Sequence, residues 1–150
     1  MSNELQAALT REVPAPIGNY RAVTLAGPVG FVSGQFPIRE GALAFRGRVG
    51  ADLTLEEGRE AARIAALNAL GQVRAALGEA FPRVRLARLD GYVASAPGFT
   101  DQAAVLDGAS DLLVRLLGER GAHARGAFAV THLPRDAALE LMLVFSLDPA

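Results

Sequence analysis

The sequence predicts an α+β fold, a two-layer sandwich in which two helices pack on one face of a single mixed β-sheet. Segments with an apolar residue at every second position indicate strands, and two long segments with apolar residues at steps of three and four indicate helices. These segments follow one another in the order strand, strand, helix, strand, helix, strand, strand. A sheet of four to six strands with both helices on one side is the natural way to bury these apolar positions.

The first third of the chain is predicted to contain two short strands. Residues 1–15 are expected to form an irregular N-terminal segment. Residues 19–25 and 29–33 have the composition of strands, and the Ala26-Gly27-Pro28 sequence between them is typical of a turn. The loop that follows Pro37 carries several glycines but matches neither a P-loop nor a dinucleotide-binding motif. These glycines therefore indicate a flexible connector.

Two long helices are predicted in the middle of the chain. Thr54 and Glu57 fit a capping box, in which each side chain accepts a hydrogen bond from the other residue's backbone N–H. The first helix should begin there and stop at Gly78. Its apolar stripe is rich in alanine, which would let the helix lie close to a sheet. The second helix is expected over residues 100–117, with a leucine-rich buried stripe.

Three further strands are predicted around and after the second helix. One spans residues 84–94, and the stretch 123–145 reads as two strands around a turn at residues 133–136. Arg125 and Glu140 stand inside these otherwise apolar strands. A guanidinium held on a strand offers a planar pair of donors to a carboxylate. The alternatives are an exposed arginine at a strand edge and a glutamate that faces solvent.

The composition excludes several kinds of chemistry. The chain has 150 residues and no Cys, and its 15 basic residues are all Arg. Disulfides and thiolate chemistry are therefore excluded, and no side-chain amine is present to form a Schiff base with pyridoxal phosphate. His123 and His132 are the two histidines, and no close pair of them exists, so no metal site is expected.

Charge and hydropathy also bear on partners and location. A net charge of −1 gives no reason to expect nucleic acid or an anionic membrane as a partner. No apolar run approaches the roughly 18 residues of a membrane span, and the first residues lack the features of a signal peptide. A soluble cytoplasmic protein is expected. The hydrophobic share of 51% indicates a buried interface between subunits.

Four motifs of this chain resemble those of one known family. They are Gly18-Asn19-Tyr20, Val32-Ser33-Gly34-Gln35-Phe36-Pro37, Gly50-Ala51-Asp52-Leu53-Thr54-Leu55-Glu56-Glu57-Gly58, and the C-terminal pattern from Arg125 through Leu133-Pro134 to Glu140. In this order and spacing they resemble the Rid proteins, the reactive-intermediate deaminases also called YjgF-like and formerly L-PSP endoribonucleases. Residues 16–150 are identified as a single domain of this family, in a divergent subgroup.

The resemblance implies a chorismate-mutase-like fold, a homotrimer and a ligand cleft between subunits. In the family an arginine at the position of Arg125 holds the substrate carboxylate, and an acidic residue at that of Glu140 orients water or relays a proton. The tyrosine that matches Tyr20 closes the cleft from a neighbouring subunit. The corner formed by Ser33 and Gly34 contacts the substrate, where a glycine lets the ligand come close.

Three positions depart from the family pattern. Gly126 and Ala127 stand where a Ser or Cys commonly follows the arginine closely. Asp107 on the second helix stands where an Asn often helps to bind the ligand. Its additional negative charge should disfavour acidic substrates if it lines the cleft.

These features lead to a hypothesis on function. The resemblance implies hydrolysis of a reactive enamine or imine, derived from an amino acid, to a keto acid and ammonia. No cofactor is expected, because an iminium carbon is already electrophilic. The alternative is a non-catalytic protein that senses a small carboxylate metabolite in the same cleft. An endoribonuclease is the least favoured reading, since the chain is acidic overall and only 6% aromatic.

Overall fold

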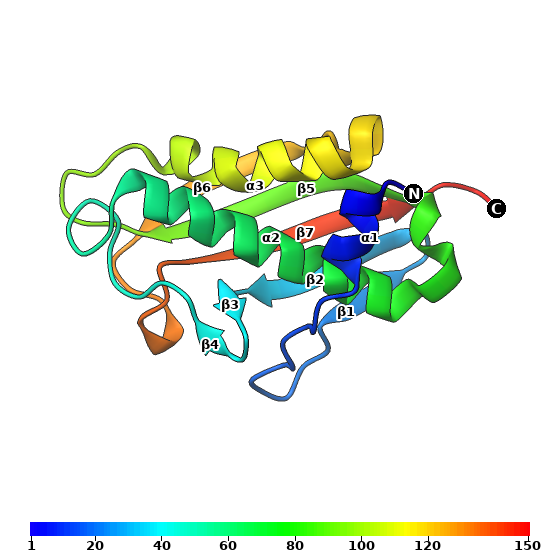
Figure 1. Cartoon of the computed structure of the whole chain (residues 1–150), viewed down its shortest axis with the longest axis horizontal. Coiled ribbons are helices and arrows are strands. Elements are labelled where there is room, and N and C mark those ends of the chain that lie inside the picture. The colour runs from blue at the N-terminus through cyan, green and yellow to red at the C-terminus, as the bar shows by residue number, and fades with distance from the viewer.

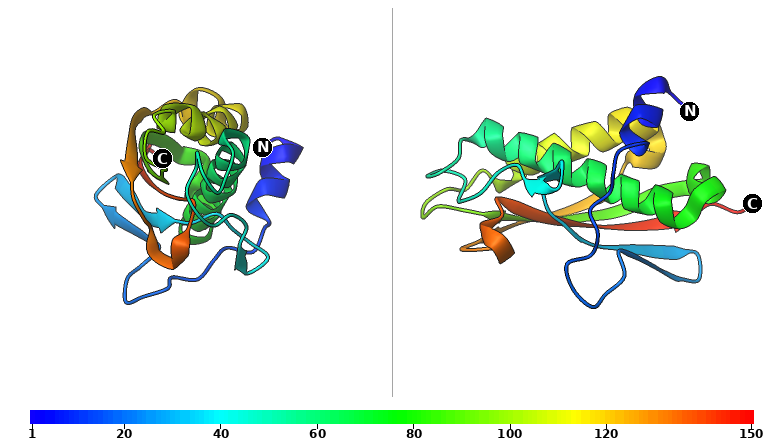
Figure 2. Two further views of the ribbon diagram at one scale, coloured as in Figure 1. Left: turned by 90° about the vertical axis from the view of Figure 1, so that its left-hand side faces the viewer. Right: turned by 60° about the horizontal axis from the view of Figure 1, so that its bottom comes forward.

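The computed structural model describes the whole chain, from Met1 to Ala150. A five-stranded sheet carries two long helices on one of its faces, which confirms the predicted α+β two-layer sandwich (Figures 1 and 2). In chain order the helices and strands are α1 (Asn3–Leu9), β1 (Val23–Ala26), β2 (Val29–Gln35), β3 (Ile38–Arg39), β4 (Ala42–Leu43), α2 (Leu55–Leu77), β5 (Val84–Ala94), α3 (Gln102–Leu117), β6 (Ala124–Val130) and β7 (Leu139–Leu147). None of the helices combines the length and the apolar composition of a transmembrane segment.

The sheet is mixed, as predicted. Its strands lie in the order β1-β2-β7-β5-β6, so β1 and β6 form its two edges. All neighbouring strands are antiparallel except β5 and β6, which are parallel and are connected by α3. A parallel pair needs such a crossover, because the chain must return to the end at which the first strand began.

The first long helix begins and ends where the sequence predicts. Thr54 Oγ1 accepts a hydrogen bond from the backbone N–H of Glu57 at 3.1 Å, and Glu57 Oε2 accepts one from the N–H of Thr54 at 2.8 Å. This reciprocal pair is the predicted capping box. The helix stops at Gly78, whose φ of 54° is easily adopted by a residue without a side chain.

The core lies between the helices and the sheet. Alternate residues of β7 point into it and are fully buried, namely Leu139, Leu141, Leu143 and Phe145. On α2 the buried face includes five alanines, Ala61, Ala62, Ala65, Ala66 and Ala69, which let the helix approach closely. No helix covers the opposite face of the sheet (Figure 2). We call it the open face; among its side chains Phe31 and Phe128 remain exposed.

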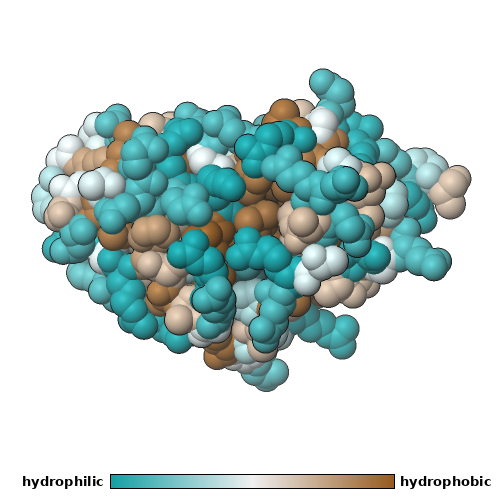
Figure 3. Space-filling model, viewed as in Figure 1, coloured by the Kyte–Doolittle hydropathy of each residue, from teal (hydrophilic) through white to brown (hydrophobic).

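The surface on the helical side is different in character. In the view of Figure 1, where α2 lies across the molecule, hydrophilic residues cover most of the surface and hydrophobic ones show in the spaces between them (Figure 3). This outer surface is therefore suited to solvent, whereas the open face presents aromatic side chains.

The N-terminal third differs from the prediction in three ways. Residues 3–9 form α1, where an irregular segment was expected, because Ser2 caps the helix and Leu5 is buried against the core. The first strand starts only at Val23 instead of residue 19. The glycine-containing loop after Pro37 holds a two-stranded hairpin, β3–β4.

The two C-terminal strands are not neighbours in the sheet. A short 3-10 turn at Pro134–Asp136 breaks the chain where the sequence predicts it. However, β7 passes to the centre of the sheet, and β5 lies between it and β6. Arg125 on β6 and Glu140 on β7 are therefore separated by a whole strand.

Candidate functional site

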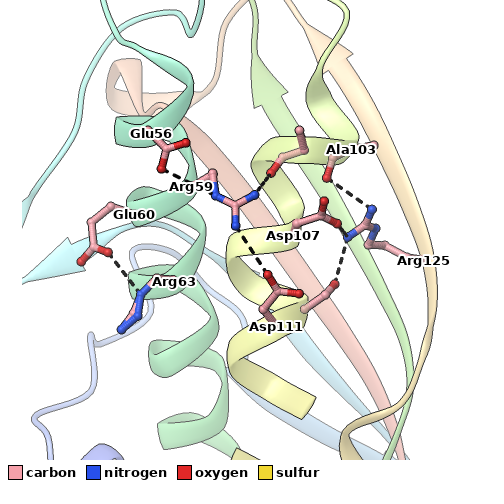
Figure 4. Close-up of polar contacts among 10 residues, drawn as sticks. Glu56, Arg59, Glu60, Arg63, Ala103, Asp107, Asp111 and Arg125 are labelled. Carbon is pink, nitrogen blue, oxygen red and sulfur yellow. Dashed lines mark hydrogen bonds and ion pairs between the residues drawn. The ribbon is translucent and has the colours of Figure 1, made fainter. Parts of the chain in front are cut away.

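Arg125 points toward the helical side of the sheet. It stands opposite Leu89 on β5, which stands opposite Leu143 on β7, and both leucines belong to the core. Residues directly opposite one another on adjacent strands share a face. The guanidinium consequently reaches α3, where Nη1 donates to Asp107 Oδ1 at 2.8 Å (Figure 4).

Two further bonds hold the Arg125 guanidinium against α3. Nη1 also donates to Ser110 Oγ at 3.0 Å, and Nη2 donates to the carbonyl oxygen of Ala103 at 3.3 Å. These bonds and the one to Asp107 use three of the five N–H donors that a guanidinium carries. The Nε–H and one Nη2–H have no partner in the chain, and these are the donors left for a carboxylate; we call them the free fork.

His123 extends this network beyond Ser110. Its Nδ1 lies 2.6 Å from the carbonyl oxygen of Gly121, which can only accept, so Nδ1 carries the proton. In the neutral imidazole Nε2 then accepts from the Ser110 hydroxyl at 2.9 Å. The Ser110 oxygen in turn accepts from Arg125. The serine is thus oriented from both sides.

We call Asp107, Ser110, His123 and Arg125 the Arg125 group. The sequence prediction included Asp107 and Arg125 but missed Ser110 and the role of His123. The spacing offered one signal, because Ser110 follows Asp107 by three residues and such residues lie on the same side of a helix. The pairing with His123 had no signal, since it depends on how α3 packs against β6.

Glu140 lies on the open face of the sheet. It stands opposite Tyr92 on β5, which stands opposite Phe128 on β6. The two aromatic rings stack with their centroids 5.1 Å apart. Arg125 and Glu140 therefore belong to opposite faces of the same sheet, and within one chain they do not form a common site.

The Glu140 carboxylate occupies the space above Gly34. A Cβ atom added to Gly34 would overlap Glu140 Oε1. The sequence predicts that this glycine lets a ligand come close; in the folded chain the group that lies against it is Glu140. The glycine is needed for the carboxylate to lie against β2.

Burial raises the pKa of Glu140 above its ordinary value of 4.5, because removal from water disfavours the charged form. A carboxyl group with a raised pKa is a stronger base than an ordinary glutamate and is better matched to proton transfer near neutral pH.

This shift predicts a pH-dependent effect of Glu140 on stability. The folded state holds the proton more tightly than the unfolded state, so the carboxylate destabilises the fold as pH rises through the ordinary pKa toward the raised one. This loss of stability is absent below about pH 4, where Glu140 is protonated in both states, and reaches its full size above the raised pKa. Glu140→Gln should therefore raise the melting temperature at pH 7 by up to a few degrees, with no gain at pH 3.5. Thermal unfolding of both proteins at the two pH values measures this. An equal gain at both values would contradict it.

Two other predicted residues lie beside Gly34. A small pocket of about 20 Å³, room for about one water molecule, is lined by both Gly34 and Tyr20. The Tyr20 hydroxyl accepts from the backbone N–H of Ile17 at 3.3 Å, and its side chain is exposed. Ser33 donates its hydroxyl to the carbonyl oxygen of Arg21 at 2.6 Å. We call Tyr20, Ser33, Gly34 and Glu140 the Glu140 group.

The remaining predicted residues, Gly126 and Ala127, directly follow Arg125 on β6. Gly126 stands opposite Asp90 and turns toward the open face, where an added Cβ would crowd the Asp90 carboxylate and the Phe128 ring. Ala127 is exposed on the edge strand β6. A hollow of about 510 Å³ between the N-terminal segment and the β3–β4 hairpin contains none of the predicted site residues. No three His, Asp or Glu side chains gather in an arrangement that could hold a metal ion.

A mixed sheet with two helices on one face, and with these motifs along its strands, defines a YjgF-like protein of the chorismate-mutase-like fold. A family model described as "YjgF/chorismate mutase-like, putative endoribonuclease" matches residues 3–147, and the chain belongs to this family. The predicted Rid/YjgF membership is thereby confirmed. The matched residues also cover α1.

Three similar proteins extend this result. Protein TCP17 of Trypanosoma cruzi is 41% identical over 135 residues, which are 89% of this chain and 84% of that protein. Protein Atu1372 of Agrobacterium tumefaciens, of unknown function, is 37% identical with a TM-score of 0.87 over 97% of this chain and 91% of its own. A structure from Shewanella oneidensis described as a putative endoribonuclease is 35% identical with a TM-score of 0.90, over 95% of this chain and 99% of its own.

The likeness to RidA itself is weaker. RidA from an Antarctic Psychrobacter shares the fold with a TM-score of 0.63 at 20% identity, over 90% of this chain and 94% of its own.

Proposed function

We propose that this protein hydrolyses small 2-imino or enamine acids to 2-keto acids and ammonia in clefts between the subunits of a homotrimer. The observation that carries the proposal is the position of the two groups. The Arg125 group holds a free fork for a carboxylate, and the Glu140 group holds a half-buried base. Since they lie on opposite faces of one sheet, a complete site needs the Arg125 group of one chain and the Glu140 group of another.

A site shared in this way favours a ring-shaped assembly of subunits. Two copies related by a two-fold axis bring the same patch of each chain together, whereas joining two different patches gives a head-to-tail contact that closes as a ring. The open face supports this arrangement, because it exposes Phe31 and Phe128 and would be covered by the neighbouring chain. Light scattering should show a trimer; a monomer at micromolar concentration would remove the site between subunits from consideration.

In the proposed reaction the Nε–H and the free Nη2–H of Arg125 bind the substrate carboxylate. Glu140 of the neighbouring chain takes a proton from water as the water oxygen attacks the imine carbon. The electron pair of the C=N bond passes to the protonated nitrogen. Glu140 then returns this proton to the nitrogen of the tetrahedral adduct. The C–N bond breaks as the carbonyl forms, and the departing ammonia takes the hydroxyl proton, so iminium acid and water give keto acid and ammonium. Tyr20, which lines a small pocket together with Gly34, and Ser33, which precedes Gly34 on β2, would contact the ligand from the same side as Glu140.

The experiment mixes two inactive variants. Arg125→Ala destroys one half of each cleft and Glu140→Gln the other half, so each alone should release ammonia from 2-aminoacrylate very slowly. When equal amounts are unfolded and refolded together, about a quarter of all clefts combine the intact halves of both chains. Activity should therefore return to about a quarter of the wild-type value, and it should stay absent when either variant is refolded alone.

Two outcomes would contradict the proposal. If the mixture stays as inactive as its components while forming trimers, the two groups do not meet in one cleft. If a 2-keto acid raises the melting temperature of the wild-type protein but the protein releases no ammonia from 2-aminoacrylate, the cleft binds a metabolite without catalysis. The protein would then be a sensor and not an enzyme.

A further inference from the structure

Arg125 and Asp107 form a close pair of opposite charges, and each retains unused binding capacity. The bond between Arg125 Nη1 and Asp107 Oδ1 is 2.8 Å long. Arg125 keeps its free fork. Asp107 Oδ2 has no partner in the chain, and 46% of the aspartate side chain is exposed to solvent. The Arg125 side chain is less exposed, with 24% of its surface accessible to solvent. A ligand that reaches Arg125 therefore also meets a free carboxylate oxygen (Figure 4).

This pair changes what the site can recognise. A guanidinium without a counter-ion attracts any anion, but here Asp107 already compensates the positive charge. An incoming ligand with one negative charge is attracted by Arg125 and repelled by Asp107, because the two charged groups lie 2.8 Å apart. A ligand that carries a positive nitrogen next to its carboxylate meets an opposite charge at both ends.

We propose that Asp107 binds the protonated nitrogen of the ligand while Arg125 binds its carboxylate, so that the site selects small zwitterionic α-imino or α-amino acids over 2-keto acids and dicarboxylic acids. The inference rests on the proposed function, because it takes Arg125 as the carboxylate-binding residue. It adds the residue that discriminates between substrates and the class of substrate that it favours.

The same selection distinguishes substrate from product. An iminium acid carries both charges, whereas the keto acid formed from it carries only the carboxylate. Loss of the nitrogen therefore turns attraction by Asp107 into repulsion. The pair would bind the substrate more tightly than the product, and the keto acid would leave without competing with the next substrate.

The test uses L-alanine and pyruvate as probes, because they differ at the carbon that carries the nitrogen or the oxygen. Isothermal titration of the full-length protein should give an affinity for alanine at least about tenfold higher than for pyruvate. In Asp107→Asn the ratio should fall to about one or reverse, because the amide keeps the size of the side chain without its charge. Asp111→Asn, on the outward side of the same helix in an ion pair with Arg59, is the matched control and should keep the wild-type ratio.

The results separate the two proposals. If Asp107→Asn weakens both ligands equally, or leaves the ratio unchanged, Asp107 only positions the guanidinium and the selection proposed here is wrong. In that case loss of both ligands in Arg125→Ala would still support the carboxylate site. If Arg125→Ala binds both probes as tightly as the wild type, the proposed function falls and this inference falls with it.

Discussion

Replacing Arg125 by alanine should strongly weaken the binding of small carboxylates and leave the fold intact. The change removes the free fork of the guanidinium, and a hydrogen bond to a charged group contributes about 1.5–3 kcal/mol. The affinity for a zwitterionic probe should therefore fall by about tenfold to a hundredfold or more. Folding should change little, because the side chain lies at the sheet edge and its ion pair with Asp107 is partly exposed.

Arg125→Lys separates charge from shape. Lysine keeps the positive charge but loses the planar fork and the simultaneous bonds to Ser110 and Ala103. Its affinity should lie nearer to that of the alanine variant than to that of the wild type. Arg115→Ala, which breaks an exposed ion pair with Glu4 at 2.9 Å, is the control for loss of a surface arginine. Calorimetric titration that finds normal binding in Arg125→Ala would show that the carboxylate site lies elsewhere.

Glu140→Gln should lower turnover by about 10²–10⁴ and leave ligand affinity nearly unchanged. The amide has the size of the carboxyl group, so it still fits above Gly34, but it cannot take a proton from water. Single-turnover release of ammonia measures the chemical step, and titration measures affinity. Glu60→Gln, which removes an acidic group from an exposed pair with Arg63 on α2, should keep full activity. Near-normal turnover in Glu140→Gln would exclude this residue as the base.

The sequence predicts best the features that depend on neighbours along the chain. The capping box at Thr54 and Glu57 and the alternating leucines of β7 are local patterns, and the structure confirms both. The short helix α1 is not predicted from its sequence, because an isolated helix of seven residues is unstable. It is stabilised by the burial of Leu5 against the core.

The site depends on contacts that no local pattern contains. Arg125 and Glu140 belong to successive strands, and nothing in their spacing indicates that β5 lies between them or that they face opposite sides. The bond from Ser110 to His123 depends in the same way on the packing of α3 against β6. The family motifs therefore predict which residues to consider for the candidate site, whereas the distribution of these residues over the two faces of the sheet is visible only in the structure.

The contact between Gly34 and Glu140 has a consequence for how this site can change over time. The two residues share one volume, since the carboxylate occupies the place of the missing side chain. Any larger residue at position 34 must displace the acid, and the acid can stay only while position 34 has no side chain. The two positions should therefore vary as a pair among related chains. A chain that has lost the acid can gain an alanine or serine at position 34 without a clash, whereas the same change in the presence of Glu140 forces the carboxylate to move.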